Sequence, residues 1–428
     1  MKPITLSGSA TVLPLWMLLL ATPAQAQLKL SDSLTLSGFG TVGVTATSTD
    51  DAHYAQPYRP DKVGRSGDAG LDSKLAVQAN LRLTPSLVGV LQVISRHTAE
   101  DTFEPSPEWA FVRWDASEQL SLRVGRIGGP VFMNSDARDV NYAQLTARPP
   151  FDVYGQVPVS HFDGADLVYR FELGAASISA SAWGGRAKAK VSDMTVQGAP
   201  AIESEVTLDK LMGVNLSLAM DSGLTLRAGT VRAHVSLGAN EAAVPGSGLS
   251  PAQASLLLDE LGARRQPITF SGVGAMYEHG PWQLNAEYTW LRSDTQIADT
   301  TGWYVNAGYR WGAFTPFIGF SRIRVDDLNI DNPLVGYVAQ AGALGDAARL
   351  IQAYQDGSKV DQQTLTLGLR WDVVDKVAVK VQWDRIFKPA QSFGGFRLKP
   401  SGDLAAVLDF YERSRQVDVM TLNLDFVF

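Results

Sequence analysis

The last segment of the chain constrains the fold more than any other feature. Between Val417 and Phe428 every second residue is apolar, and the residues between them are mostly polar. The apolar set that ends the chain is Met420, Leu422, Leu424, Phe426 and Phe428. Alternation with a period of two places the two sets on opposite faces of a β-strand. An apolar strand face that ends on an exposed aromatic residue fits a closed sheet in a membrane, where every backbone polar group must find a partner.

The opposite end of the chain, residues 1–26, has the pattern of a secretory signal. Lys2 precedes a short apolar run, and Ala24-Gln25-Ala26 supplies the small residues of a cleavage site. The apolar run is well short of the ~20 residues that a membrane helix needs. We therefore expect a signal peptide at 1–26, with cleavage after Ala26, and an exported domain at 27–428.

The composition fits an exported protein rich in strands. The chain has no cysteine, which excludes disulfides and thiolate metal sites. A mean hydropathy of −0.03 is too polar for a helical membrane protein but is typical of a transmembrane barrel, where lipid-facing and lumen-facing residues alternate. The formal net charge of −7 argues against nucleic acid as a partner.

Period-two alternation recurs along the chain and indicates sixteen candidate strands. The clearest runs from Trp282 to Trp290, with an apolar face that begins and ends on tryptophan and a polar opposite face. Seven short breaks alternate with eight long ones, the asymmetry expected between the turns and loops of an outer-membrane barrel. We predict an all-β fold, a transmembrane antiparallel barrel of sixteen strands, with fourteen and eighteen as alternatives. A barrel of this size leaves an aqueous channel.

The third long segment, 127–162, carries the most specific motifs. They are Gly128-Gly129-Pro130, Arg138-Asp139-Val140-Asn141-Tyr142, Ala147-Arg148-Pro149-Pro150 and, where the next strand begins, Asp163-Gly164-Ala165-Asp166. On these residues the chain resembles the bacterial outer-membrane porins, both general and phosphate-selective, of Gram-negative proteobacteria. The resemblance implies that 127–162 is a constriction loop folded into the lumen. The acidic Pro-Glu-Phe-Gly-Gly motif of enterobacterial general porins is absent, so their preference for cations does not carry over.

Charged residues are the candidate chemistry of such a pore. Several arginines share the polar parity of their strands, and the third loop adds charges of both signs. Facing charges of opposite sign can discriminate ions at a constriction. The predicted constriction residues are Arg82, Arg123, Arg126, Asp136, Arg138, Asp139 and Arg148. The excess of arginine predicts a mild preference for anions. For about half of these charged residues, the alternative to a role in the constriction is that they form ion pairs that hold the loop against the wall.

Two further patterns do not indicate chemistry. Residues 38–43 match the G-x-G-x-x-G motif of dinucleotide-binding loops, but a strand continues where such a loop would open a helix. We interpret these glycines as part of the first strand. The five histidines are scattered without the convergent spacing of a zinc site. We therefore expect no catalytic residue, no metal, no cofactor and no enzyme activity.

The combined prediction is an outer-membrane porin through which small hydrophilic solutes and ions diffuse passively. Two alternatives stay open: a channel selective for an anion or organic acid, and a structural or receptor barrel that does not conduct. The expected partners are membrane lipid, lipopolysaccharide, the barrel-assembly machinery, small solutes and two further copies in a homotrimer. The terminal residues Phe428, Phe426 and Leu424 resemble the signal that the assembly machinery recognises.

Overall fold

The structure is a computed structural model that describes most of the exported chain. The described residues are 28–55, 62–99, 101–193, 202–237, 265–294, 297–329, 332, 334–398 and 409–428. The predicted signal peptide, 1–26, lies outside them.

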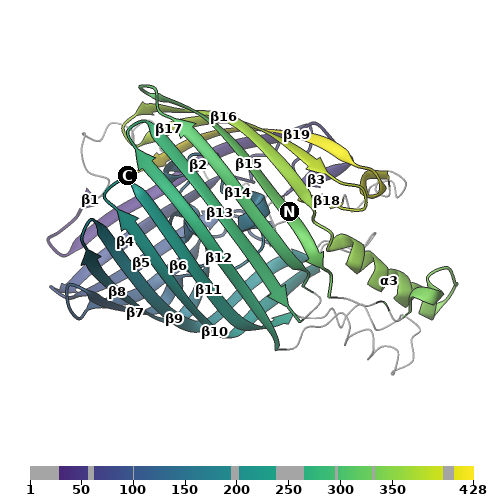
Figure 1. The fold of residues 1–428 in the computed structure, drawn as a ribbon, viewed down its shortest axis with the longest axis horizontal. Helices are drawn as coiled ribbons and strands as arrows, with labels where there is room; N and C mark the ends of the chain where they lie inside the picture. Colours follow the sequence, from purple (N-terminus) through teal and green to yellow (C-terminus); the bar gives the residue numbers. More distant parts are fainter. Residues whose placement is uncertain are drawn as a thin grey trace, which may run out of the picture.

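The described strands form one closed antiparallel barrel (Figure 1). Its sheet has seventeen strands, and one of these, β1 (Leu28–Lys29), is a two-residue strand paired with β2, which leaves sixteen strands in the wall. Each wall strand pairs with the next, and the last pairs with the first, so the prediction of a sixteen-stranded barrel is confirmed. The wall strands are β2 (Leu34–Thr47), β4 (Lys74–Thr84), β5 (Leu87–Arg96), β6 (Ser106–Asp115), β7 (Leu120–Gly128), β8 (His161–Leu173), β9 (Ala176–Asp193), β10 (Ile202–Met220), β11 (Leu224–Leu237), β12 (Gln266–His279), β13 (Trp282–Ser293), β14 (Asp299–Tyr309), β15 (Phe314–Asp327), β16 (Gln362–Val374), β17 (Val377–Lys388) and β19 (Arg415–Val427).

Sequence alternation sets the face of each wall residue. On β10, Met212, Val214 and Leu216 are 65%, 54% and 54% exposed, whereas Asn215 between them is 9% exposed. Successive side chains of a strand point to opposite faces. The outer face of the wall is therefore apolar and the inner face largely polar, as in a barrel that meets lipid outside and water inside.

Short turns and long loops lie at opposite ends of the barrel. Gly174, Gly280 and Gly312 adopt φ of 61°, 57° and 60° in three of the short turns, a region that glycine enters without steric cost. The other end carries α3 (Ala343–Gly357), η5 (Val335–Tyr337) and a separate sheet of β3 (Ala52–Tyr54) and β18 (Phe396–Leu398) (Figure 1). Among the described residues, no helix is both long and apolar enough to cross a membrane.

The closing seam between β19 and β2 accounts for the glycines near the start of the chain. A Cβ atom on Gly38 would lie 2.3 Å from the ring of Phe428, and one on Gly40 would lie 2.4 Å from the ring of Phe426. The backbones of Gly38 and Phe428 also exchange two hydrogen bonds, of 2.8 and 2.9 Å. The first two glycines of the G-x-G-x-x-G match therefore make room for the terminal aromatic rings.

Candidate functional site

The third loop, residues 129–160, crosses the lumen from β7 and β8 to the opposite wall. It contains η2 (Ser135–Ala137), η3 (Asn141–Ala143) and α1 (Phe151–Tyr154). The amide of Met133 donates to Glu287 on β13 at 2.8 Å, and the hydroxyl of Ser321 on β15 donates to Asp152 at 2.5 Å. The loop is shorter by two residues at each end than the predicted 127–162, because those residues still pair between β7 and β8. The loop thus contacts the inner face of the wall on β13 and β15.

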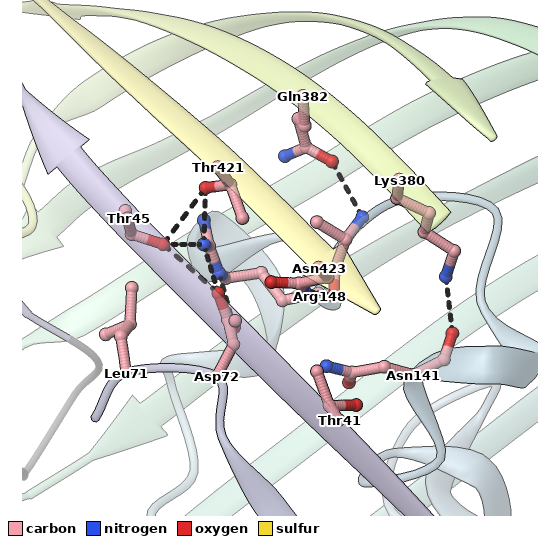
Figure 2. A network of polar contacts seen from close by, with 12 residues as sticks. Thr41, Thr45, Leu71, Asp72, Asn141, Arg148, Lys380, Gln382, Thr421 and Asn423 are labelled. Carbon is pink, nitrogen blue, oxygen red and sulfur yellow. Dashed lines mark hydrogen bonds and ion pairs between the residues drawn. The ribbon is translucent and has the colours of Figure 1, made fainter. Parts of the chain in front are cut away.

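A buried ion pair fixes the middle of the loop (Figure 2). Arg148 donates to the carboxylate of Asp72 from Nε at 2.9 Å and from Nη2 at 2.5 Å. The same Nη2 donates to the hydroxyls of Thr45 and Thr421, at 2.9 and 2.7 Å. The side chains of Arg148 and Asp72 are 6% and 0% exposed. Arg148 also lies 3.8 Å from the carboxylate of Asp384, so removing Arg148 would leave buried carboxylates without their cation, which is strongly destabilising.

A buried lysine holds the turn around η3. The ammonium of Lys380 on β17 donates to the carbonyl of Asn141 at 2.5 Å (Figure 2). It also donates to the carbonyls of Gln144 and Thr146, at 2.7 and 3.0 Å. It also pairs with Asp425 on β19 at 3.1 Å, and both side chains are 0% exposed. Because the three acceptors lie within the short loop segment from Asn141 to Thr146, this one cation fixes the loop path over several residues.

A third anchor joins the loop to the structure at the barrel mouth. The carboxylate of Asp152, in α1, accepts hydrogen bonds from Ser321 at 2.5 Å and from the amide nitrogen of Gln362 at 2.6 Å. The amide oxygen of Gln362 accepts in turn from the backbone of Gly395, beside β18, at 2.7 Å. Asp152 is 1% exposed, and its burial raises the pKa of the carboxyl to about 6. Docking of the loop is therefore coupled to the protonation of this side chain.

The loop packs on the opposite side through apolar contacts. Phe132 and Val153 belong to a buried cluster that includes inward residues of β9, β10 and β11. The ring of Phe132 stacks on Tyr154 with centroids 4.4 Å apart and meets the edge of Phe270 on β12 at 5.3 Å. The loop is thus held by polar anchors on one side and by a hydrophobic core on the other.

A first row of arginines follows the inner wall of β4 to β8. In the hydrogen-bond register Arg82 lies opposite Val88, Val88 opposite Arg113, Arg113 opposite Arg123 and Arg123 opposite Asp166. Directly opposite residues share a face of the sheet. Nε of Arg123 donates to both carboxylate oxygens of Asp166 at 2.9 Å. The side chains of Arg113 and Arg123 are 44% and 25% exposed, so this row remains accessible from the lumen.

A second row continues the pattern from β8 to β11. Arg170 lies opposite Ser179, Ser179 opposite Ser217 and Ser217 opposite Arg227. The guanidinium of Arg227 donates to the backbone carbonyl of Pro130 in the third loop at 2.7 Å. No carboxylate within the described residues forms an ion pair with Arg170 or Arg227, so their charges add to the positive potential of this wall.

Asp136 is the loop carboxylate that faces these rows. It lies in η2, is exposed, and forms no hydrogen bond or ion pair with any residue that the structure describes. Its charge nevertheless acts on both Arg123 and Arg227. A negative charge on the loop and positive charges on the wall therefore act on one another.

Arg126 does not line the lumen, and its assignment to the constriction is corrected. It lies three residues beyond Arg123 on β7, an odd offset that places it on the other face of the strand. It shares that face with Val124, which is 62% exposed, and pairs outside the wall with Asp163 at 2.8 Å. The alternation of the strand continues through Arg126 rather than ending before it.

Three other predicted residues hold the loop in place. Arg148 does so through the ion pair described above. Arg138 donates to loop carbonyls, including that of Val159 at 3.1 Å, and burial lowers the pKa of its guanidinium. Asp139 pairs with Arg96 on β5 at 2.5 Å. Of the seven predicted residues, Arg82 and Arg123 belong to the first row on the inner face of the wall, and the charge of Asp136 acts on Arg123.

Arg113 and Arg96 were missed, although a signal for each exists in the sequence. Arg113 stands between Val112 and Trp114, and Arg96 lies two residues beyond Ile94, so each has the inward parity of its strand. Within the described residues, no group of three or more His, Asp or Glu side chains is placed to hold a metal ion.

Comparisons with known proteins agree with this architecture. A model of the Gram-negative porin family matches residues 9–387. No curated protein matches the chain in sequence. Among solved structures, the outer-membrane channel DcaP of Acinetobacter baumannii is 10% identical with a TM-score of 0.54, covering 94% of this chain and 100% of that one. OmpF of Salmonella typhi, in complex with daunomycin, is 14% identical with a TM-score of 0.53 and the same coverage. An anion-selective porin from Comamonas acidovorans is 11% identical with a TM-score of 0.50, covering 92% and 99%.

These likenesses support the fold, and the family match extends over most of the chain. Porins are channel proteins of the outer membrane, which agrees with a barrel that is apolar outside and polar inside. The chain belongs to the Gram-negative porin family.

Proposed function

We propose that this porin passes small hydrophilic anions more readily than cations of the same size. As a porin it forms a water-filled channel of the outer membrane through which solutes diffuse passively. The selectivity would arise where the third loop narrows the lumen, between Asp136 on the loop and the arginine rows on the wall. The similarity in fold to an anion-selective porin is consistent with this proposal.

The observation that carries the proposal is the imbalance of charge on the accessible inner wall. Arg82, Arg170 and Arg227 have no carboxylate partner within the described residues, whereas Arg123 is paired with Asp166. Most acidic groups near the loop, by contrast, are buried in its anchors. A solute that passes the loop therefore meets more unpaired positive than negative charge, which favours anions.

Planar-bilayer recording with the purified protein in a potassium chloride gradient tests this proposal. We expect ohmic conductance and a reversal potential shifted toward that of chloride. Arg123→Gln and Arg227→Gln should each move the reversal potential toward zero, because each removes a lumenal charge. Arg126→Gln is the matched control, since it removes the same charge from the outer face of β7 and should leave the reversal potential unchanged. A silent barrel would refute channel function, and equal shifts from Arg123→Gln and Arg126→Gln would remove the arginine rows from the selectivity site.

We further infer the partners and processing that this function requires. The signal peptide is removed after Ala26, so amino-terminal sequencing of the exported protein should begin at Gln27. The family resemblance supports a homotrimer surrounded by membrane lipid and lipopolysaccharide, which a heat-modifiable band on a gel of the extracted protein would reveal. Leu424, Phe426 and Phe428 lie on the outer face of the closing strand and would act earlier, as the signal read by the assembly machinery.

A further inference from the structure

The motif near the start of β8, residues 163–166, places its two carboxylates on opposite faces of the wall. Asp163 and Asp166 are separated by an odd offset along the strand, which puts them on different faces. In the register with β7, Asp163 lies opposite Arg126 and Asp166 lies opposite Arg123. Each carboxylate pairs with the arginine opposite it. The motif therefore builds two ion pairs between the same two strands, one outside the barrel and one inside.

The inner pair holds its carboxylate out of solvent. Nε of Arg123 donates to both carboxylate oxygens of Asp166 at 2.9 Å, and Nη2 donates to one of them as well. The side chain of Asp166 is 1% exposed, whereas that of Asp163 in the outer pair is 60% exposed. Charge-assisted hydrogen bonds between arginine and a carboxylate are strong and fix geometry. The negative charge of Asp166 is therefore fixed behind the guanidinium of Arg123.

The guanidinium of Arg123 is held by a second contact and remains open to the lumen. Its Cζ lies 5.4 Å from the centre of the Phe111 ring on β6. A cation over an aromatic ring is attracted by the negative face of that ring. The side chain of Arg123 is 25% exposed, so a solute can approach it while the carboxylate of Asp166 stays covered. The ring contact does not involve Asp166 and would persist if that residue lost its charge.

The charges that act on one another around Arg123 are balanced. Asp136, in η2 of the third loop, acts on Arg123 and on Arg227. With Asp166 these side chains form a group of two acidic and two basic residues, whose formal charges sum to zero. Without the charge of Asp166 the same group would carry one net positive charge. The buried carboxylate therefore decides whether this part of the inner wall is neutral or positive.

A balanced group suits a channel that must release its solutes. Conduction requires binding that is favourable enough for an ion to enter and weak enough for it to leave. A site with a net positive charge would hold anions longer, and those with two charges longest. The exposed guanidinium of Arg123 can still attract an anion, but the carboxylate of Asp166 behind it reduces that attraction.

We propose that Asp166 is a specificity-determining residue that limits the anion preference of the channel by neutralising Arg123, so that doubly charged anions pass without being trapped. The inference rests on the function proposed above and concerns the strength of its selectivity. It also fixes the sign of a substitution. If Asp166 only positioned Arg123 to attract anions, removing its charge would weaken the preference for anions. If Asp166 limits that attraction, removing its charge strengthens the preference.

Reversal potentials of the purified protein in planar bilayers test the proposal. Asp166→Asn keeps the shape of the side chain and an oxygen that can accept from Arg123, but removes the charge. A unit charge about 8 Å from an ion in water changes the local concentration of that ion about two-fold, so the ratio of chloride to potassium permeability should rise about five-fold. The gradient is made with about 10 mM potassium chloride, where the Debye length is about 30 Å and screening is weak. Asp163→Asn is the matched control, because it removes the same charge from the outer pair and should leave the ratio unchanged.

Two further measurements separate neutralisation from positioning. Arg123→Gln should lower the permeability ratio about five-fold, and the double variant Asp166→Asn/Arg123→Gln should restore it, because the two lost charges are opposite. Sulfate should block the chloride current of Asp166→Asn at about five-fold lower concentration than that of the wild type, since a doubly charged anion gains twice the attraction.

The direction of the shift decides the outcome. A lower ratio in Asp166→Asn, as in Arg123→Gln, would overturn the proposal and leave Asp166 with a positioning role only. Equal ratios in Asp166→Asn and Asp163→Asn would overturn it as well. If Asp166→Asn does not fold, the double variant decides, because it leaves neither charge unpaired: the ratio of the wild type supports the proposal and the ratio of Arg123→Gln refutes it. A wild type that prefers cations would refute the proposed function alone, since the role of Asp166 is judged by the change and not by the starting ratio.

Discussion

Docking of the third loop should depend on pH through Asp152. The undocked, hydrated carboxyl has a pKa of 3.8, whereas burial in the docked loop raises it to about 6. The docked state therefore binds the proton more tightly. Docking is strongest below pH 3.8 and weakens as the pH rises toward about 6. Above that pH the loss of docking free energy is complete. The interval of about two pKa units corresponds to about 3 kcal/mol of docking free energy, or roughly a 100-fold change in the docking equilibrium.

Hydrogen exchange in detergent micelles would measure this change at the backbone of α1. The amides of Tyr154 and Gly155 donate to Pro150 and Phe151 at 3.0 and 2.8 Å, and their protection reports on opening of the loop. After correction for intrinsic exchange rates, we expect protection to fall by up to about 100-fold between pH 4 and pH 7.5. Asp152→Asn keeps a side chain of the same shape without the titration and should flatten the profile. An unchanged profile in that variant would refute the reasoning and assign the pH dependence to another group.

Three further predictions concern the loop anchor and the closing seam. Arg148→Met should weaken docking by about 3–5 kcal/mol, because it leaves the Asp72 carboxylate buried without its ion-pair partner; increased open-channel noise in bilayer recordings would reveal it, and a quiet channel would contradict it. Gly40→Val should destabilise the barrel by about 1–3 kcal/mol through collision with Phe426, measured as a lower temperature of heat modification on gels. Gly89→Ala is the control, since its Cβ would lie 3.9 Å from the nearest atom outside its chain neighbours. Deletion of Phe428 should impair membrane insertion more than the conductance of the molecules that do insert, and efficient insertion of the shortened chain would count against its role as an assembly signal.

The barrel could be predicted because its two faces meet different solvents. A wall strand between lipid and water must alternate, so the face of each residue can be read from its parity. The segment from Trp282 to Trp290 shows this, since its alternation alone predicts a strand and the segment lies in β13. Counting such segments predicts the correct number of strands because each of them crosses the membrane once.

The interior of the channel was less predictable because its contacts join residues far apart in the chain. Arg148 and Asp72 are 76 residues apart, and Arg148 and Thr421 are 273 apart. Nothing in the local pattern of the third loop distinguishes a charge that faces solute from one that is buried against the wall. Arg126 differs in this respect. Strand β7 extends to Gly128, and the odd offset between Arg123 and Arg126 places Arg126 on the outer face.

The way the loop is held determines which charges remain for solutes. Arg138, Arg148, Asp139 and Asp152 are all engaged in anchoring, which leaves Asp136 as the loop charge without a partner among the described residues. Anchoring charges must stay buried and paired to be stable, so they cannot also screen a passing ion. Substitutions in the anchors should therefore alter how firmly the loop is docked, whereas substitutions in the arginine rows should alter which ions pass. Under the proposed function, fold and selectivity are therefore separate, because the loop would supply the constriction and the wall most of its accessible charge.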